Sequence, residues 1–195
     1  ALQSISLPEN LTSLGNWVFS GCTALNNLII PSRVKSIGCY AFSGCTSLSN
    51  LEIKSGILEN TGYYGDGYLF NDCIKLKTVS LTGDLKSIPA DMFEGAEYLE
   101  TLKIPSTVTT ISKSAFSGCT SLQQITIPEA VTSIEENAFK NCLSLTSLII
   151  PSKVESIGYY AFGHCDNLCD VEIKSDNLKN IGIYGSTSIF GDCIS

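Results

Sequence analysis

The sequence predicts a β-rich α/β fold, a solenoid of eight coils with short parallel strands along one side and short helical or 3₁₀ turns and loops elsewhere. The first observation behind this prediction is phenylalanine spacing, since five of the seven intervals are 23 residues and two are 28. The second is that units aligned on these rings share the pattern L-x-x-L-x-I-P-x-x-V-x-x-I-G-x-x-A-F-x-x-C-x-x. Such a short unit cannot bury its apolar edge alone, but stacked units can. The rings are Phe19, Phe42, Phe70, Phe93, Phe116, Phe139, Phe162 and Phe190.

Each part of the unit predicts one element of a coil. The L-x-I segment has a period of two, which indicates a short strand with one buried face. Proline then ends the strand because it cannot continue the hydrogen-bonded ladder. The V-x-x-I segment reverses the chain and buries two more side chains, and A-F-x-x-C fits a single helical or 3₁₀ turn. The strand-ending prolines are Pro31, Pro105, Pro128 and Pro151.

The repeats cover residues 1–195 as one domain. The chain starts on a core-type leucine and stops just after a core-type cysteine, so we expect it to be an excised part of a larger protein. The eight units begin at Leu2, Leu25, Leu48, Leu76, Leu99, Leu122, Leu145 and Leu168.

The repeat closely resembles the BspA-like leucine-rich repeat, a 23-residue bacterial class with the signatures L-x-x-L-x-L-P and A-F-x-x-C. The resemblance spans the whole chain. It implies a curved, right-handed leucine-rich-repeat solenoid whose strands line the concave face. It also implies a surface or secreted bacterial protein, with signal peptide and anchor outside this chain, and several family members act as adhesins. The fourth unit departs most from the pattern, at Thr82, Pro89 and Ala96.

The charge of the chain argues against two classes of partner. The formal net charge is −7 and no block of Lys or Arg occurs, whereas nucleic acids and anionic membranes require a basic face. No apolar run approaches the ~20 residues that span a bilayer. We therefore expect no nucleic-acid partner and no membrane insertion.

Seven of the nine cysteines share one repeat position, which indicates a buried ladder of small side chains rather than a metal site. Ala96 fills that position in the fourth unit, and free thiols are expected. Cys39 and Cys169 lie off the ladder and are expected to be exposed. The pair Cys165 and Cys169 has no second pair and no suitable histidine, so no metal or other cofactor is predicted. The ladder consists of Cys22, Cys45, Cys73, Cys119, Cys142, Cys165 and Cys193.

The titratable residues give no support for an enzyme. The single histidine, His164, is expected in a surface turn, and no Ser or Asp partner can be placed beside it. Glu135 and Glu136 are adjacent in a turn and should diverge, whereas an acid/base pair needs a shared cleft. We expect no catalytic residues.

The third and eighth units have the 28-residue spacing and replace proline with Lys54 and Lys174. Residues 25–73 and 145–193 match at 27 of 49 positions, which indicates duplication of a five-coil block. One interpretation is a neutral insertion that was copied, because loops on a solenoid cost little free energy. The other is a protruding binding loop, since tyrosine offers a large contact area at low entropic cost. Its candidate residues are Tyr63, Tyr64, Asp66 and Tyr68, with Tyr184 in the second copy.

The strand face is the rival candidate site. Side chains between the two buried residues of each strand should point out of the sheet, into a small, polar and nearly neutral surface. The isoleucines on this face are apolar exceptions beside glutamates, and they could anchor a partner. The candidate contacts are Ile29, Glu52, Lys103, Ile149 and Glu172.

Two functions from different classes remain open. The first is a protein- or glycan-binding module, plausible as an adhesin for host or neighbouring cells, which the family resemblance implies. The second is a structural spacer without a ligand of its own. A binder should gather aromatic or apolar side chains on one exposed side, whereas a spacer should not. End-to-end self-association is also possible, since uncapped solenoid ends expose sheet edges.

Overall fold

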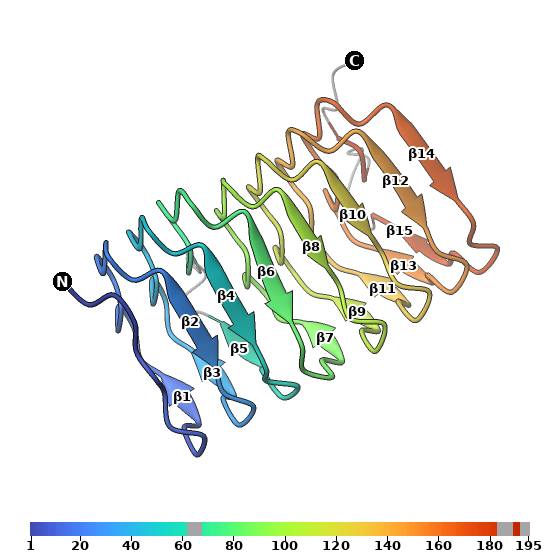
Figure 1. Ribbon diagram of the computed structural model, residues 1–195. Helices are drawn as coiled ribbons and strands as arrows, with labels where there is room; N and C mark the ends of the chain where they lie inside the picture. Colours follow the sequence, from blue (N-terminus) through green and yellow to red (C-terminus); the bar gives the residue numbers. More distant parts are fainter. Residues whose placement is uncertain (62–67, 183–188, 192–195) are drawn as a thin grey trace.

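The computed structural model describes residues 1–61, 68–182 and 189–191, and it confirms the predicted solenoid. The chain advances as a right-handed coil, with the N-terminus at one end of the stack and the last coils at the other (Figure 1). Every strand pairing in the described residues is parallel, as a solenoid of stacked coils requires.

One row of strands, here named the strand face, comes from the L-x-I segments (Figure 1). Alternate residues are buried, as in the exposed–buried–exposed–buried pattern of β2, so the predicted period of two is confirmed. The first coil adds only a bridge from Ser4 to Asn27. The strands are β2 (Asn27–Ile30), β4 (Asn50–Ile53), β6 (Thr78–Leu81), β8 (Thr101–Lys103), β10 (Gln124–Thr126), β12 (Ser147–Ile150) and β14 (Asp170–Ile173).

A second row of two-residue strands follows the first, and sequence reasoning predicted only a chain reversal there. The Ser-Ile dipeptide within V-x-x-I is too short to display a period of two, so its parallel pairing appears only when coils stack. These strands are β1 (Ser13–Leu14), β3 (Ser36–Ile37), β5 (Asn60–Thr61), β7 (Ser87–Ile88), β9 (Thr110–Ile111), β11 (Ser133–Ile134), β13 (Ser156–Ile157) and β15 (Asn180–Ile181).

The A-F-x-x-C segment forms turns, and none of the described residues is helical. Cys45 N–H donates to Phe42 O at 3.0 Å, which is the i→i−3 bond of a 3₁₀ turn. The intervening amide of Gly44 donates instead to Asn71 O of the next coil at 2.8 Å. Because every second N–H group donates to a carbonyl of the next coil and not to one of its own, the turn cannot extend into a helix.

The core consists of apolar side chains that repeat from coil to coil. The phenylalanine rings stack along the axis, with centroids 5.0 Å apart at Phe116–Phe139 and 5.9 Å apart at Phe19–Phe42. The cysteine ladder lies beside this stack and contributes hydrogen bonds as well as packing. Cys45 Sγ, for example, donates to Phe19 O of the preceding coil at 3.1 Å.

Of the two predictions for the off-ladder cysteines, the one for Cys169 is confirmed and the one for Cys39 is wrong. Cys169 is exposed, but Cys39 is buried, with 5% of its surface accessible. Cys39 lies two residues after β3, and its N–H donates to Asn16 Oδ1 at 3.0 Å, so stacking against the first coil covers it. Cys193 lies outside the described residues. No helix in the described part of the chain has the length and apolar character needed to cross a membrane.

Candidate binding surface

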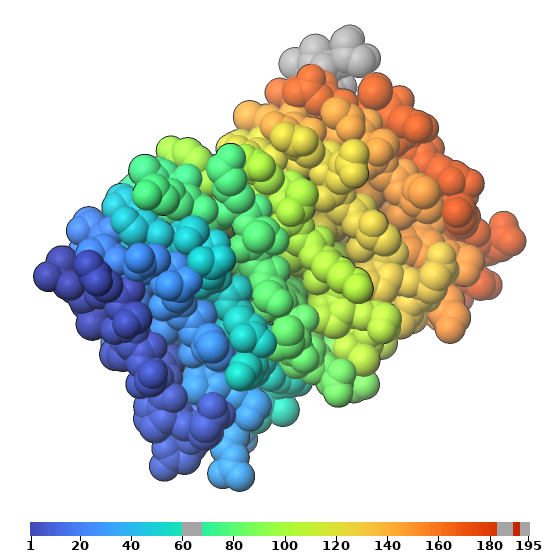
Figure 2. All heavy atoms as spheres, in the orientation of Figure 1, coloured from blue at the N-terminus to red at the C-terminus, as the bar shows by residue number. Residues whose placement is uncertain are grey.

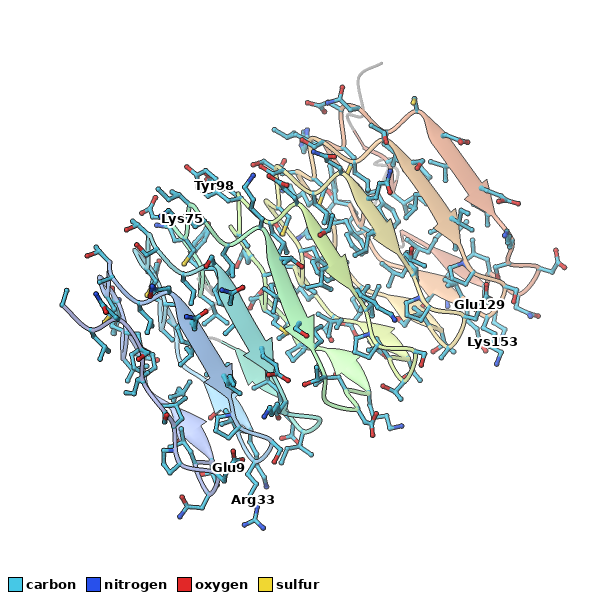
Figure 3. The ribbon with its side chains drawn as sticks, in the orientation of Figure 1. Glu9, Arg33, Lys75, Tyr98, Glu129 and Lys153 are labelled. Atoms are coloured by element: carbon cyan, nitrogen blue, oxygen red, sulfur yellow. The ribbon has the colours of Figure 1, made fainter. Side chains whose placement is uncertain are left out.

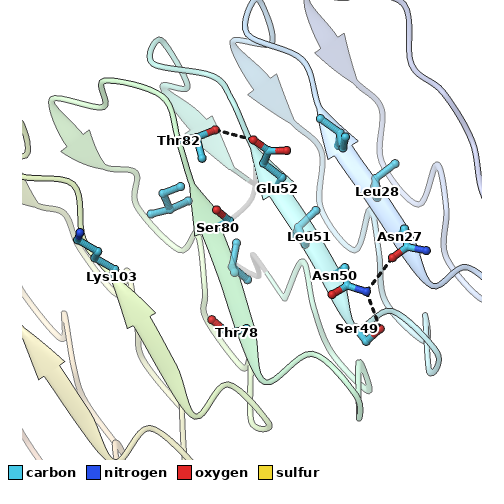
Figure 4. Close-up of a pocket in the computed structure, with 13 residues that line it drawn as sticks. Asn27, Leu28, Ser49, Asn50, Leu51, Glu52, Thr78, Ser80, Thr82 and Lys103 are labelled. Atoms are coloured by element: carbon cyan, nitrogen blue, oxygen red, sulfur yellow. Dashed lines mark hydrogen bonds between the residues drawn. The ribbon is translucent and has the colours of Figure 1, made fainter.

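The strand face contains a groove of about 710 Å³, here named the strand-face groove. It extends over β2, β4 and β6 as far as β8 (Figure 4). None of the described residues that line it is aromatic; eight of the thirteen are polar or charged, and the other five are aliphatic. The polar side chains and the lysine and glutamate of its lining are Asn27, Ser49, Asn50, Glu52, Thr78, Ser80, Thr82 and Lys103.

Hydrogen bonds between neighbouring strands order this lining. Asn50 Nδ2 donates to Asn27 Oδ1 at 2.7 Å, and Thr82 Oγ1 donates to Glu52 Oε1 at 2.9 Å (Figure 4). Each side chain keeps further donor or acceptor capacity, because an amide offers two donors and a carboxylate about four acceptor sites. The groove therefore presents a pre-ordered set of hydrogen-bonding groups, most of them uncharged.

Ile29 and Lys103 are the exposed apolar side chain and the lysine of this lining. Ile29 is 47% exposed and pairs in register with Glu52, as the sequence predicts for residues between the buried positions. Lys103 is exposed on β8 and forms no ion pair among the described residues. An apolar anchor and an available cation thus occur in the same groove.

The second copy of the duplicated block repeats part of this arrangement. Ile149 is 49% exposed and pairs in register with Glu172. It lines a smaller groove of about 280 Å³ together with Gln124, Ser147 and Lys174. Glu172 does not line that groove, and its Oε2 lies 3.7 Å from Lys174 Nζ. The exposed Ile–Glu pair is therefore duplicated, but its surroundings are not.

Charged side chains also occur in the turns that follow the strands. Figure 3 shows Glu9, Arg33, Glu129 and Lys153 along this rim of the strand face, away from the middle of the sheet. The space-filling view shows the coils as continuous bands across the same face (Figure 2). A ligand that spans several coils would thus meet Glu52 and Lys103 within the groove and further charges at the rim.

Of the candidate loop residues, only Tyr68 belongs to the described part of the chain. Its ring centroid lies 6.0 Å from that of Tyr40, and its ring covers Gly95, where an added Cβ would lie 2.4 Å from the Tyr68 ring. Tyr68 is thus half-buried against neighbouring coils. Tyr63, Tyr64, Asp66 and Tyr184 lie outside the described residues.

Sequence reasoning missed two aromatic residues at the surface, the exposed Trp17 and the half-buried Tyr40. Trp17 and Tyr40 occupy the same repeat position as Tyr68, two residues before the core phenylalanine, and their rings stack at 5.9 Å with an interplanar angle of 0°. The signal was an aromatic residue that recurs two positions before the phenylalanine. It becomes visible when this one position is compared from coil to coil. We name Trp17, Tyr40 and Tyr68 the aromatic column.

The other titratable candidates have structural partners. Glu135 Oε2 accepts from Lys113 N at 2.9 Å, and Glu136 Oε1 lies 3.3 Å from Lys113 Nζ. His164 has a φ of 55° in a turn, and its N–H donates to Gly191 O at 2.9 Å. In the described ranges, no cluster of three or more His, Cys, Asp or Glu residues could hold a metal ion.

The stacked coils, the parallel rows and the repeated phenylalanine and cysteine turns define a leucine-rich-repeat solenoid. The chain belongs to the BspA type leucine rich repeat family, whose model matches residues 1–97 and 86–194. No curated protein matches the chain.

Solved bacterial structures share the fold. A leucine rich cell surface protein from Faecalibacterium prausnitzii is 31% identical, with a TM-score of 0.63, over 89% of this chain and 48% of that one. A leucine-rich repeat protein from Bacteroides ovatus is 26% identical, with a TM-score of 0.57, over 92% and 45% of the two chains. The T. pallidum leucine-rich repeat protein, 23% identical with a TM-score of 0.54 over 90% and 70%, shows the fold alone. The chain thus spans about half the length of the first two structures.

Proposed function

We propose that this chain is a non-enzymatic module of a bacterial surface or secreted protein and that it binds a protein or glycan through the strand-face groove. The observation that supports this most directly is the groove itself, with hydrogen-bonding side chains, Glu52 among them, around the exposed Ile29. Such a combination of an apolar anchor and convergent polar groups is typical of recognition sites.

The residues of the groove favour recognition over catalysis. Glu52 is the single carboxylate among the described lining residues, and it accepts a hydrogen bond from Thr82. General acid–base catalysis needs a titratable group within reach of the reacting proton, usually with a second group to complete the proton transfers. We therefore assign the groove to binding.

The likeness to a Faecalibacterium cell surface protein supports a location outside the cell for this chain. A surface location would give the groove access to host proteins, mucins or the surfaces of neighbouring cells. Adhesion is thus the biological role that we propose for the binding.

Two exposed isoleucines allow a direct test. The Ile29→Ser, Ile149→Ser double variant should lower the affinity for a protein or glycan partner about tenfold or more, because it removes apolar anchors from the strand face. Binding would be screened against matrix proteins, mucins and bacterial glycans by biolayer interferometry. Ile74→Ser is a matched control, because Ile74 is similarly exposed (45%) but does not line either groove.

The outcomes separate the alternatives. Unchanged affinity in the double variant would contradict the groove as the site, and a variant with residues 63–68 shortened would then test the tyrosine loop. The absence of binding by the folded wild-type protein would favour a structural spacer.

A further inference from the structure

A second surface feature lies in the turn after the second row of strands and not on the strand face. It is the aromatic column, in which Trp17 stacks on Tyr40 at 5.9 Å and Tyr40 contacts Tyr68 at 6.0 Å. Trp17 is 59% exposed, and the two tyrosines are half-buried. Three neighbouring coils thus place large aromatic rings side by side at the surface.

The backbone shows that these rings are unfavourable for folding. Trp17 and Tyr40 both have a φ of 53°, a left-handed conformation that bulky residues rarely adopt because of steric crowding at Cβ. The next coils fill the same position with Asp91, Ser114 and Asn137, also at positive φ. Since small polar residues suffice there, the solenoid does not require an aromatic residue at this position. Strain of this kind often marks functional sites.

The same repeat position already contacts a cation elsewhere in the molecule. In the seventh coil the position holds Tyr160, and Lys140 Nζ lies 5.6 Å from its ring centroid. This distance is within the range of cation–π attraction. A ring at this position is therefore accessible to an amino group that approaches along the solenoid surface.

The charges around the aromatic column also favour a cationic partner. The position after Tyr68 in the column holds Asp91, and the chain has a formal net charge of −7. Lys113, whose charge also acts on Asp91, pairs with Glu136 at 3.3 Å. Rings beside a carboxylate suit arginine especially, since guanidinium both stacks on aromatic faces and pairs with carboxylates.

We propose that the aromatic column, together with Asp91, binds a polypeptide segment that carries arginine or lysine. A neutral glycan is a poorer match, since it gains nothing from Asp91 or the net negative charge. This surface is independent of the strand-face groove, so the chain would offer two contact regions to partners.

Trp17 is the only tryptophan of the chain, so its fluorescence reports directly on this site. The probe is a synthetic peptide of alternating arginine and glycine, titrated into the whole chain at low and moderate salt. We expect a saturable change in Trp17 fluorescence whose affinity falls as salt is raised, because salt screens the attraction to Asp91. The controls are a glutamate–glycine peptide of equal length and a neutral chitooligosaccharide.

Tyr40→Asn is the decisive variant, because it keeps the net charge and Asn137 already occupies the equivalent position with a φ of 57°. It should weaken peptide binding about tenfold, as loss of a cation–π contact predicts. Asp91→Asn should weaken binding and flatten the salt dependence. Tyr98→Asn, at an exposed tyrosine outside the column, and Ile29→Ser, in the groove, should bind like wild type.

Equal affinity of wild type and a folded Tyr40→Asn variant would overturn the proposal, because non-specific attraction to a negative protein would then explain the binding. A fluorescence response to the oligosaccharide without one to the arginine peptide would overturn it in favour of a glycan. Trp17→Asn, followed by calorimetry, gives a second test that does not depend on Tyr40.

Discussion

At the scale of single residues, two left-handed positions define the turn around the phenylalanine in six of the coils. The second of them, two residues after the ring, is glycine in four described coils and Asp72, Asn141 or His164 in three others. The position explains the single histidine without any catalytic role. The four glycines are Gly21, Gly44, Gly95 and Gly118.

Gly118→Ala tests this requirement where space is not limiting. An added Cβ would lie 3.5 Å from the nearest atom, an ordinary contact, so the cost comes from the φ of 75° alone. We expect a loss of about 1–2 kcal/mol in the free energy of unfolding. Gly118→Asn should cost less, because asparagine tolerates this conformation. Equal losses in urea denaturation for both variants would contradict the explanation.

At the scale of the repeated turn, the cysteine thiol is a hydrogen-bond donor to the preceding coil. Cys119 Sγ donates to Phe93 O at 3.2 Å, and Cys73 Sγ donates to Phe42 O at 3.2 Å. Burial raises the pKa of Cys45 to about 11 and that of Cys73 to about 12, and a neighbouring ladder cysteine adds to each rise. The thiols of Cys45 and Cys73 thus keep their protons, as the donor role requires.

These raised pKa values predict a loss of stability in alkali. An unfolded thiol releases its proton near pH 8.5, whereas the folded one retains it until pH 11 or 12. Between these values the unfolded state binds fewer protons, so the free energy of unfolding falls as pH rises. At about 1.4 kcal/mol per pKa unit, Cys45 should contribute a loss of roughly 2–3 kcal/mol by pH 11.

The comparison of wild type with Cys45→Ala, by urea denaturation from pH 8 to pH 11, isolates this contribution from lysine and tyrosine titration. Alanine is a suitable replacement, because Ala96 occupies the same ladder position in the fourth coil. The variant should start less stable and lose roughly 2 kcal/mol less over this range. Parallel curves for the two proteins would exclude the thiol as the cause.

At the scale of the whole molecule, stability arises between neighbouring coils. Neighbouring described coils contact one another through the stacked rings and through the two rows of strands, although the second row is interrupted between β5 and β7. The contribution of a neighbour is visible at equivalent positions, because Ile173 and Ile181 are 45% and 53% exposed, whereas their partners Ile150 and Ile157 in the seventh coil are buried. End-to-end association through such residues stays a prediction, measurable by sedimentation.

Deletion of a complete coil tests whether each coil is stabilised mainly by its two neighbours. Removal of residues 122–144, one 23-residue unit, joins Ser121 to Leu145 in register. The shortened chain should keep its circular dichroism per residue and unfold cooperatively at a lower temperature, because one coil and one interface are lost. Removal of residues 122–132 alone should abolish cooperative unfolding, since it shifts the buried side chains out of register.

Part of the candidate site could be predicted from the sequence. Ile29, Glu52, Lys103, Ile149 and Glu172 lie on the strand face because the strand period fixes which side chains point outward. The groove was not predictable, because it depends on side-chain sizes across four strands. The aromatic column was missed because its members lie 23 and 28 residues apart and become neighbours only when coils stack.

The sequence by itself determined the solenoid, the number of coils and the buried positions, because a repeat with a fixed period permits one way of stacking its apolar side chains. The tertiary structure alone decided the second row of strands, the burial of Cys39 and the contact between Trp17 and Tyr40. These features arise from pairing between coils, and a two-residue strand or a lone surface ring carries no periodic signal of its own.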